Sequence, residues 1–327
     1  MSDPRPLVFF GSGAFGVPVL SRLAGRGQVA LVVSQPDRQA GRGRAPTPTP
    51  VAAWALEHGL PLLRCQDANA ESSLQAIRAA APVAFVVIAF GQKLLPALLE
   101  EPAGRPRFAI NLHGSLLPRW RGAAPIQRAV MEGDAEAGVT VISIAPRMDA
   151  GVVYGEARTL VGAAETSGEV HDRLAALGPD LVDDVLRRWW DAGRVLAGAA
   201  QDESLATRAR KLSKEDAWVD LAAPARLVAA RLNGLQPWPG CDALLDGAPL
   251  RLCRASAFER LPQSAAHLPP GRLLPDGVLR CGDGAVQLLE VQSPGGRILP
   301  WREWVRGHPL GAEAAIRSGP ELTRRDR

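Results

Sequence analysis

The sequence predicts an α/β fold with a doubly wound parallel sheet, followed by a smaller antiparallel β-barrel. The first observation is a series of continuous apolar runs, which is typical of parallel strands buried on both faces. The second is that segments of helical periodicity separate these runs. The third is a change of character after residue 232, where short apolar pieces alternate with glycine-containing turns.

The first half of the chain alternates between predicted strands and predicted helices, the pattern of a Rossmann-like sheet. The apolar runs that predict its first strands are Leu7–Phe10, Val29–Val33 and Val83–Ile88. Helices are predicted around residues 17–23, 51–57 and 72–80. We expect the sheet to end near Tyr154 and a long helix, from Glu169 to about Trp190, to close this domain.

A linker and a second domain are predicted for the rest of the chain. Residues 191–207 are rich in Ala and Gly and are expected to link a catalytic domain of residues 1–190 to a basic domain of residues 208–327. In that domain a helix is predicted from Pro224 to Leu232, and strands at 250–253, 271–274, 278–281 and 286–291. The separators Asp276-Gly277, Gly282-Asp283-Gly284 and Gly295-Gly296 favour tight hairpin turns, as in a small antiparallel barrel.

Polar side chains at a predicted strand end are the first candidates for catalysis. In the run Phe108–His113, Asn111 and His113 point to one face, because strand side chains alternate with a period of two. Residues 114–122 contain Gly and Pro and predict a loop at the edge where open α/β sheets bind ligands. An isolated histidine is often a structural core residue, but the neighbouring amide favours a catalytic role for His113.

A second predicted strand, residues 139–144, is followed by a turn that presents Asp149 from the neighbouring edge. The three candidates are thus an amide, an imidazole and a carboxylate. Since no Ser or Cys nucleophile accompanies them, the set indicates transfer to an external nucleophile rather than a covalent intermediate.

The loop after Asn111 carries a resemblance to a known family. Residues 111–127 read Asn-Leu-His-Gly-Ser-Leu-Leu-Pro-Arg-Trp-Arg-Gly-Ala-Ala-Pro-Ile-Gln, which resembles the signature of the folate-dependent formyltransferases. Further matches follow the expected order: Gln35-Pro36-Asp37-Arg38, Gly41-Arg42-Gly43, Lys211-Leu212-Ser213-Lys214-Glu215 and Pro237-Trp238-Pro239-Gly240. The chain departs from the family where Gly11-Ser12-Gly13 replaces Gly-Thr-Pro, and where Met148-Asp149-Ala150-Gly151 replaces Leu-Asp-Thr-Gly while keeping Asp149.

The resemblance implies a reaction, its partners and the site residues. It implies transfer of a formyl group from 10-formyltetrahydrofolate to the amino group of methionine esterified to initiator tRNA, and an OB-fold-like form for the second domain. Asn111 would stabilise the negative oxygen of the tetrahedral intermediate, His113 would be the general acid, and Asp149 would orient the imidazole or take the proton of the amine. The expected folate-binding residues are Phe90, Gly91, Ser115, Leu116, Leu117 and Pro118. The expected tRNA-binding residues are Arg38, Arg42, Arg44, Lys211 and Lys214.

The segment Gly11-Ser12-Gly13-Ala14-Phe15-Gly16 suggests an alternative. It follows a predicted strand, precedes a predicted helix and has Asp37 downstream, which is the pattern of a dinucleotide site. However, Asp37 lies beside Pro36 and a glycine-containing stretch that predict a long loop rather than a strand tip. We therefore expect the glycines to form a turn and expect no NAD.

The loop from Ser34 to Pro50 is long for a connection between a strand and a helix, and such loops tend to be functional or disordered. It carries Arg38, Arg42 and Arg44 against the single carboxylate of Asp37. Glycines beside Arg42 would let the guanidinium reach a phosphate. The alternative is a solvated loop without a role.

Composition and charge fit an ordinary globular protein, with 46% hydrophobic and 22% charged residues. No apolar stretch predicts a membrane span or a signal peptide, so we expect a cytoplasmic protein and a monomer. The spacing of Cys65, Cys241, Cys253 and Cys281 supports neither a metal site nor a disulfide framework. From Arg208 onward 18 Lys and Arg face 13 Asp and Glu, against 20 and 21 before it, a bias that fits a phosphate-bearing partner or plain surface charge.

Four other functions are alternatives to formylation of tRNA. A glycinamide ribonucleotide formyltransferase or a formyltetrahydrofolate hydrolase would share the amide, imidazole and carboxylate, but would need neither the basic barrel nor Gly41-Arg42-Gly43. An RNA-binding module without folate chemistry would need no catalytic triplet. An NAD-dependent dehydrogenase would use the first glycine-rich turn.

Overall fold

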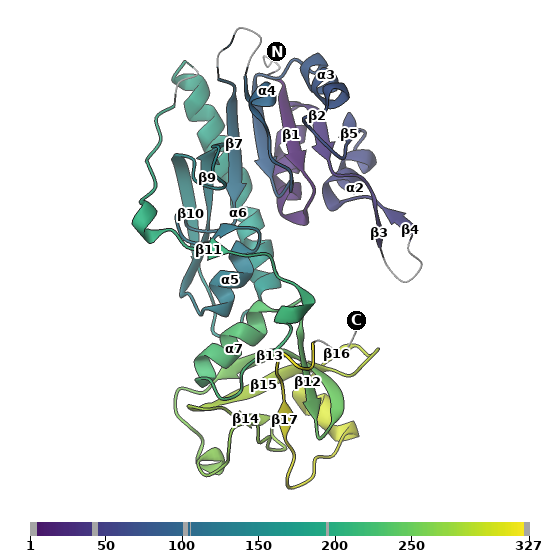
Figure 1. The fold of residues 1–327 in the computed structure, drawn as a ribbon, viewed down its shortest axis with the longest axis vertical. Helices are drawn as coiled ribbons and strands as arrows, with labels where there is room; N and C mark the ends of the chain where they lie inside the picture. Colours follow the sequence, from purple (N-terminus) through teal and green to yellow (C-terminus); the bar gives the residue numbers. More distant parts are fainter. Residues whose placement is uncertain (1–4, 41–44, 101–103, 105, 194–195, 324–327) are drawn as a thin grey trace. The chain divides into compact units, whose positions relative to one another are not determined.

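The computed structural model describes residues 5–40, 45–100, 104, 106–193 and 196–323 (Figure 1). The chain divides into two compact units. The first consists of Met1–Arg121, Gly138–Arg158 and Asp172–Ala206. The second consists of Gly122–Ala137, Thr159–His171 and Thr207–Arg327, so two short segments from the first half of the sequence belong with the C-terminal part.

A seven-stranded sheet forms the centre of the first unit, in the order β10-β9-β7-β6-β1-β2-β5. Strands β5, β2, β1, β6 and β7 pair in parallel, whereas β9 pairs with β7 in the antiparallel direction. The strands are β1 (Leu7–Gly11), β2 (Val29–Ser34), β5 (Leu62–Arg64), β6 (Ala84–Ile88), β7 (Phe108–His113), β9 (Glu136–Ser143) and β10 (Val153–Leu160). The predicted α/β sheet is confirmed, and it is mostly parallel.

One detail of the predicted sheet was wrong. The sheet does not end near Tyr154, because β10 continues to Leu160. Its side chains are alternately half-buried and exposed and include Glu156 and Arg158, a pattern of an edge strand that resembles a surface loop in the sequence. The second predicted strand is β9, which runs antiparallel to β7, so that Ser143 at its end lies opposite Ile110.

Helices cover the sheet, and the contacts between α6 and β7 show which face of β7 carries the predicted site residues. Trp189 of α6 stacks on Phe108 with ring centroids 4.2 Å apart, and a Cβ on Gly178 would lie 2.7 Å from Leu112. Phe108 and Leu112 therefore face α6, and by alternation Asn111 and His113 point to the other face. The helices of this unit are α1 (Val17–Gly25), α2 (Pro50–Glu57), α3 (Glu71–Ala79), α4 (Pro96–Leu99) and α6 (Ser167–Asp191).

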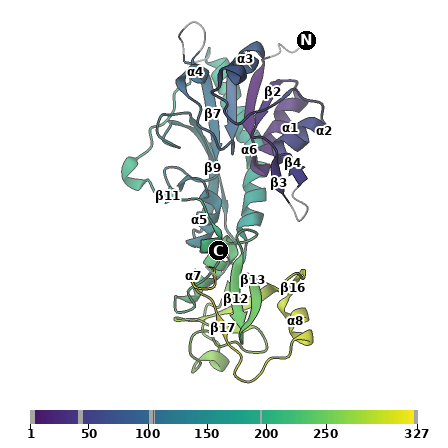
Figure 2. The same ribbon diagram turned by 45° about the vertical axis from the view of Figure 1, so that its right-hand side comes forward.

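Helix α1 lies beside α6 on the same side of the sheet (Figure 2). Arg22 of α1 pairs with Asp180 and Asp183 of α6 at 3.0 and 2.8 Å. On the opposite face of the sheet, Phe10, Phe85, Val87 and Ala109 belong to one apolar cluster. Asn111 and His113 continue the row that begins with Ala109, so they extend from this apolar core toward the carboxyl edge of β7.

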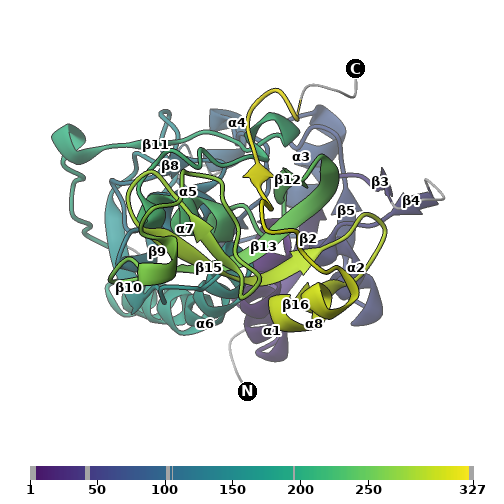
Figure 3. The same ribbon diagram turned by 90° about the horizontal axis from the view of Figure 1, so that it is seen from below.

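The second unit contains an antiparallel sheet in the order β14-β15-β13-β12-β17, with β16 paired to β15, and helix α7 packs against β13 (Figure 3). Its strands are β12 (Cys241–Leu245), β13 (Ala248–Ala257), β14 (Val278–Arg280), β15 (Ala285–Gln292), β16 (Ile298–Pro300) and β17 (Ile316–Arg317). Its helices are α5 (Pro125–Met131), α7 (Ala225–Gly234) and α8 (Trp301–Trp304). The predicted turns before β15 and β16 are confirmed, since β15 forms hairpins with β14 and β16.

The segment 271–274 joins the two edges of this sheet instead of forming a full strand. Leu273 forms a bridge with Leu279 next to Arg280 of β14, and Arg272 forms one with Ala315 next to β17. The N–H of Gly271 donates to Arg280 at 2.8 Å, and its carbonyl accepts from Ile316 at 2.8 Å. Because this segment bonds to both edge strands, the sheet closes into the predicted barrel.

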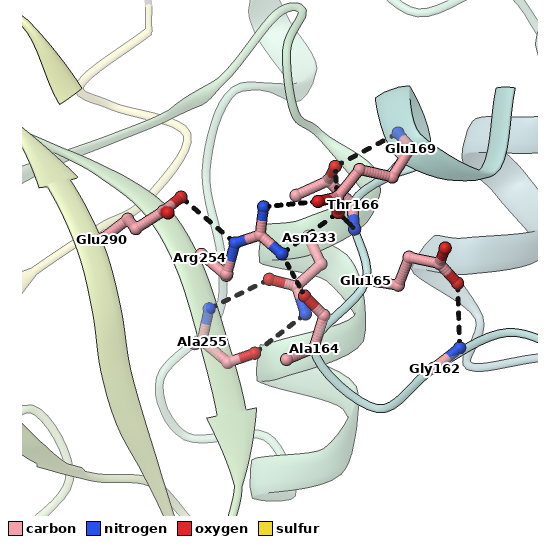
Figure 4. Close-up of polar contacts among 9 residues, drawn as sticks. All are labelled: Gly162, Ala164, Glu165, Thr166, Glu169, Asn233, Arg254, Ala255 and Glu290. Carbon is pink, nitrogen blue, oxygen red and sulfur yellow. Dashed lines mark hydrogen bonds and ion pairs between the residues drawn. The ribbon is translucent and has the colours of Figure 1, made fainter. Parts of the chain in front are cut away.

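Arg254 holds the segment before α6 against the barrel (Figure 4). Its guanidinium donates to Glu290 of β15 at 3.1 Å, to the carbonyl of Ala164 at 3.2 Å and to both oxygens of Glu169 at 2.8 and 3.1 Å. The Arg254 side chain, followed by Thr166, lowers the pKa of Glu169 from its usual 4.5 to about 2 against the opposing effect of burial. The ionised carboxylate of Glu169 therefore stabilises the fold, and this contribution is lost when low pH protonates the group.

We expect Glu169→Gln to lower stability at neutral pH but not near pH 2. The pKa of Glu169 is lower in the folded than in the unfolded chain, so its contribution is complete above the usual value of 4.5 and disappears as pH falls toward 2. Since both partners are partly exposed, solvent screening limits the contribution to about 1 kcal/mol. Thermal unfolding of both proteins from pH 7 to 2 measures it, with Glu165→Gln as a control on the same segment. A difference that does not change with pH would contradict this assignment.

Within the ranges that the structure describes, no helix is both long and apolar enough to cross a membrane. Among the same residues, no group of three or more His, Cys, Asp and Glu side chains is placed to hold a metal ion. The four cysteines are free and buried, and burial raises the pKa of Cys241 and of Cys281 to about 12. These thiols are therefore packing groups.

Candidate functional site

His113 lies at the end of β7 and is only 6% exposed. Its Nε2 lies 2.9 Å from the carbonyl oxygen of Trp120. Because a carbonyl can only accept a hydrogen bond, Nε2 must carry the hydrogen. This contact fixes the ring through Nε2 and leaves Nδ1 as its other polar atom.

The carboxylate of Asp149 lies beside that second nitrogen, with Oδ2 3.7 Å from Nδ1 of His113 and 13% of the side chain exposed. This separation is too long for a direct hydrogen bond, but it places the carboxylate next to the imidazole. The structure therefore brings together two of the predicted catalytic residues. It does so through the loop of residues 144–152, because β9 itself ends near Ile110.

The backbone of that loop is unusual at two positions. Asp149 has a φ of +53°, a region that few residues other than glycine adopt, although Asp is enriched there. At Gly151 a Cβ would lie 1.9 Å from the carbonyl oxygen of Ser143, so a side chain has no room. The turn that presents Asp149 therefore depends on specific contacts around it.

Asn111 is half-buried and lies between Val87 of β6 and Ile142 of β9. It points to the same face as His113, as the alternation of β7 predicts. Throughout the described ranges, the structure shows no hydrogen bond from the Asn111 side chain. Its amide can therefore donate to a ligand at the edge where the imidazole and the carboxylate meet.

The loop that follows His113 is held by Thr140 of β9, whose side chain is fully buried. The Thr140 hydroxyl donates to the carbonyl of Ser115 at 2.7 Å and accepts from the N–H of Leu117 at 3.2 Å. The Ser115 hydroxyl donates to the carbonyl of Arg119 at 2.6 Å and is itself buried. Of the predicted folate-binding residues in this loop, Ser115 and Leu117 thus face inward, whereas Leu116 and Pro118 are half-buried.

The structure places Phe90 differently from what a ligand-binding ring would require. Its side chain is 2% exposed and packs edge to face on Phe10, with centroids 5.4 Å apart. Its carbonyl accepts from Gln35 at 2.8 Å. Gly91 has a φ of +79°, and a Cβ there would lie 2.5 Å from the Gln35 amide nitrogen. The ring of Phe90 fills the core, so at Phe90 a ligand could meet only the main chain.

The first glycine-rich turn has a structural role. The N–H groups of Ser12 and Gly13, which a pyrophosphate would need, donate to the carbonyl of Ala89 at 3.3 and 3.4 Å. A 3₁₀ turn, Ala14–Gly16, separates these glycines from the start of α1. The carboxylate of Asp37, which a ribose would need, accepts from Arg64 at 2.8 Å. The groups of the dinucleotide pattern are therefore engaged within the protein.

The predicted tRNA-binding residues fall into three sets. Arg38 is exposed on β3 (Arg38–Ala40), which pairs with β4 (Ala45–Thr47). Arg42 and Arg44 lie outside the described residues. In the second unit, Lys211 and Lys214 are exposed, and Lys214 begins a 3₁₀ turn that Ser213 and Asp216 cap reciprocally.

The sequence did not indicate two residues that support the site, Thr140 and Gln201. The sequence marks Thr140 only as part of a predicted strand. Gln201 belongs to the segment predicted as a linker, yet its side chain donates to the carbonyls of Asp149 and Gly151 at 2.9 and 2.8 Å. The segment is therefore not a free tether where it passes the Asp149 turn.

Comparison with known families matches two models to this chain. Residues 5–186 match the formyl transferase model, and residues 211–309 match the model of the formyl transferase C-terminal domain. Among curated proteins, the methionyl-tRNA formyltransferase of Methylococcus capsulatus is 38% identical over 312 residues, covering 94% of this chain and 98% of that protein. The methionyl-tRNA formyltransferase of Paracoccus denitrificans is 41% identical over 311 residues, covering 93% and 98%.

Solved structures resemble this fold. The N-formyltransferase of Helicobacter canadensis, solved in complex with folinic acid and dTDP-3-aminofucose, superposes with a TM-score of 0.64 at 11% identity, covering 86% of this chain and 97% of that one. HypX from Aquifex aeolicus in complex with tetrahydrofolic acid gives a TM-score of 0.59 at 15% identity, covering 93% and 47%. At these identities the likeness establishes the fold alone.

Proposed function

Because the chain belongs to the formyl transferase family, we propose that it transfers the formyl group of 10-formyltetrahydrofolate to the amino group of methionine on initiator tRNA. The observation that carries the chemistry is the His113–Asp149 pair, 3.7 Å apart, at the edge to which Asn111 also points. Curated relatives that cover almost the whole chain and act on methionyl-tRNA support the choice of acceptor.

Asn111 and His113 have complementary roles in this proposal. The amine attacks the formyl carbon, and negative charge develops on the formyl oxygen. The amide of Asn111 donates a hydrogen bond to that oxygen. Protonated His113 delivers the proton on Nδ1 to the departing folate nitrogen, while Nε2 stays bonded to Trp120. The carboxylate of Asp149 faces Nδ1 of the ring and, directly or through water, takes the proton that the amine loses.

The folate would bind beside this edge and contact Leu116, Pro118 and the main chain at Phe90 and Gly91. Two of these residues lie in the loop that Thr140 holds, and Gly91 follows the end of β6. The backbone at both places is fixed by hydrogen bonds, which suits a pocket formed before its ligand arrives. Ser115 contributes by holding the loop closed.

The tRNA would contact basic residues, namely Arg38, Arg42, Arg44, Lys211 and Lys214. In this assignment residues 1–190 supply the chemistry, and the barrel of residues 208–327, which we infer to be OB-fold-like, binds the tRNA. The support is the exposure of Arg38, Lys211 and Lys214 together with the basic bias after Arg208.

A comparison of acceptors tests this function. The protein is incubated with 10-formyltetrahydrofolate and methionyl initiator tRNA, glycinamide ribonucleotide or water alone, and the formylated product is identified by mass spectrometry. We expect formylmethionyl-tRNA. Formylation of glycinamide ribonucleotide, or release of formate with no preference for tRNA, would replace the proposal with one of the related activities.

The proposed tRNA-binding residues provide a second expectation. Lys214→Ala and Arg42→Ala should raise the KM for methionyl-tRNA and leave the KM for the folate unchanged. Each should also lower the salt dependence of tRNA binding by about one phosphate contact. Steady-state kinetics at several salt concentrations measures both effects, with Arg78→Ala on α3 as a control for loss of positive charge. Equal changes in the KM values of both substrates would argue against a tRNA contact.

A further inference from the structure

We propose that Gln201 and Arg121 are positioning residues that set the separation between His113 and Asp149. This inference rests on the proposed function, because it assigns these residues to the same reaction. Neither side chain contacts the imidazole or the carboxylate. Both act through the main chain of the two loops that carry the contacts of His113.

The side chain of Gln201 is the link to the Asp149 turn. Its amide nitrogen donates to the carbonyl of Asp149 at 2.9 Å and to the carbonyl of Gly151 at 2.8 Å. An amide nitrogen has two hydrogens, so these two bonds use its full donor capacity. They hold the turn on both sides of Ala150, where Asp149 has its φ of +53°.

The oxygen of the same amide is the link to the loop after His113. It accepts from Nε and Nη2 of Arg121 at 3.0 and 2.7 Å. Arg121 is in turn fixed by Glu203, which accepts from both terminal nitrogens at 3.0 Å, and the Arg121 side chain is only 10% exposed. A bidentate guanidinium of this kind has little freedom to rotate.

These contacts form a closed circuit around the imidazole. Nε2 of His113 bonds to the carbonyl of Trp120, and Arg121 is the next residue in the chain. Arg121 bonds to Gln201, and Gln201 bonds to the main chain of Asp149. The carboxylate of Asp149 then faces Nδ1 of His113 at 3.7 Å. The two partners of the ring are therefore linked to each other through Arg121 and Gln201.

The main chain just before Gln201 is hydrogen-bonded to the chain that follows the Asp149 turn. Ala199 and Val153 exchange two backbone hydrogen bonds of 2.8 and 2.9 Å, so the segment lies along the chain just after the Asp149 turn. Gly198 approaches closely, since a Cβ there would lie 2.8 Å from Val152. Gln201 thus lies two residues after Ala199, whose main chain these hydrogen bonds fix.

The variant Gln201→Glu separates positioning from simple attachment. A carboxylate still accepts from Arg121, and the added charge strengthens that contact. However, it cannot donate to the carbonyls of Asp149 and Gly151. If the side chain only attached the segment to Arg121, Gln201→Glu would keep full activity. If it positions Asp149, the variant should lose activity although Arg121 is still held.

We expect kcat for formylation of methionyl-tRNA to fall about 10- to 100-fold in Gln201→Glu, which is the usual effect of a displacement of about 1 Å at a reacting group. The KM values for folate and tRNA should stay within about twofold, because neither substrate touches Gln201 in this scheme. Asp202→Ala is the matched control. It removes the carboxylate that caps the adjacent 3₁₀ turn through Ser204, at 2.9 Å, and should retain wild-type kcat.

A crystal structure of Gln201→Glu provides a measure that does not depend on activity. We expect the carboxylate of Asp149 to move away from Nδ1 of His113. An unchanged separation, or a wild-type kcat in Gln201→Glu, would overturn the positioning role. A wild-type protein that formylates no methionyl-tRNA would instead overturn the proposed function, so the two failures can be told apart.

Discussion

Replacement of His113 or Asn111 by Ala is expected to lower kcat by about 10²- to 10³-fold, the usual effect of removing a general acid or an oxyanion donor. The reason is geometric for both residues. The His113 ring is fixed through Trp120 so that one nitrogen remains for proton transfer, and the amide of Asn111 points to the same edge. Single-turnover measurement of formyl transfer tests both variants at the chemical step.

The control for these variants is His58→Ala, because His58 lies in the same unit, is exposed and stacks on Trp54 at 3.8 Å, away from the edge of β7. It should retain wild-type activity. Unfolding midpoints of all three variants should show that the fold survives. A single-turnover rate near that of the wild type for His113→Ala or Asn111→Ala would refute the assignment.

The placement of Asn111 and His113 could be predicted from sequence because it depends only on local rules. Alternation along β7 puts both residues on one face, and the Gly- and Pro-rich loop after them marks the strand end. The strongly apolar strands β1, β2 and β6 could be predicted for the same reason. Their runs of consecutive apolar residues predict strands that are covered on both faces, and β1 and β6 are buried in the structure.

The supporting contacts could not be predicted, because they join distant segments through side chains whose local sequence carries no signal. Gln201 follows an Ala- and Gly-rich stretch, which by composition resembles a linker, yet it bonds to Asp149 across 52 positions. The antiparallel direction of β9 was also hidden. A buried apolar strand has the same pattern in either direction, and only its partner β7 decides.

In the barrel, too, features that depend on adjacent residues could be predicted, whereas features that depend on distant residues could not. Its hairpin turns contain glycine beside Asp or another glycine, so the pairs β14–β15 and β15–β16 could be expected. Its closure could not, since residues 271–274 bond to edge strands that are themselves only a few residues long. Turns are encoded by a few adjacent residues, whereas closure depends on the register of the whole sheet.

The glycine-rich turn after β1 shows how a short motif can mislead. Its glycines meet the sequence rule for a dinucleotide site, but the rule does not report whether the N–H groups are free. In the structure the N–H groups of Ser12 and Gly13 are already bonded to Ala89. Such a motif therefore needs its hydrogen-bond partners to be known before it can be assigned to a cofactor.

Asp149→Asn should lower kcat by about 10²-fold or more, because it removes the negative charge beside His113 and the group that can take the proton of the amine. Asn is the appropriate replacement, since Asn tolerates the positive φ of position 149 and keeps the size of the side chain. In Asp149→Ala, by contrast, a loss of activity could come from a shifted backbone. Single-turnover kinetics together with unfolding midpoints distinguishes the two effects.

The chain contains a matched control for this substitution. Asp246, between β12 and β13, also has a positive φ, +48°, and its carboxylate accepts from the N–H of Ala315 at 2.9 Å. Asp246→Asn therefore makes the same chemical change at a similar backbone conformation, in the barrel. It should leave kcat unchanged. If Asp149→Asn kept kcat within about threefold of the wild type, the carboxylate would be a structural group, and His113 with Asn111 would have to supply the chemistry alone.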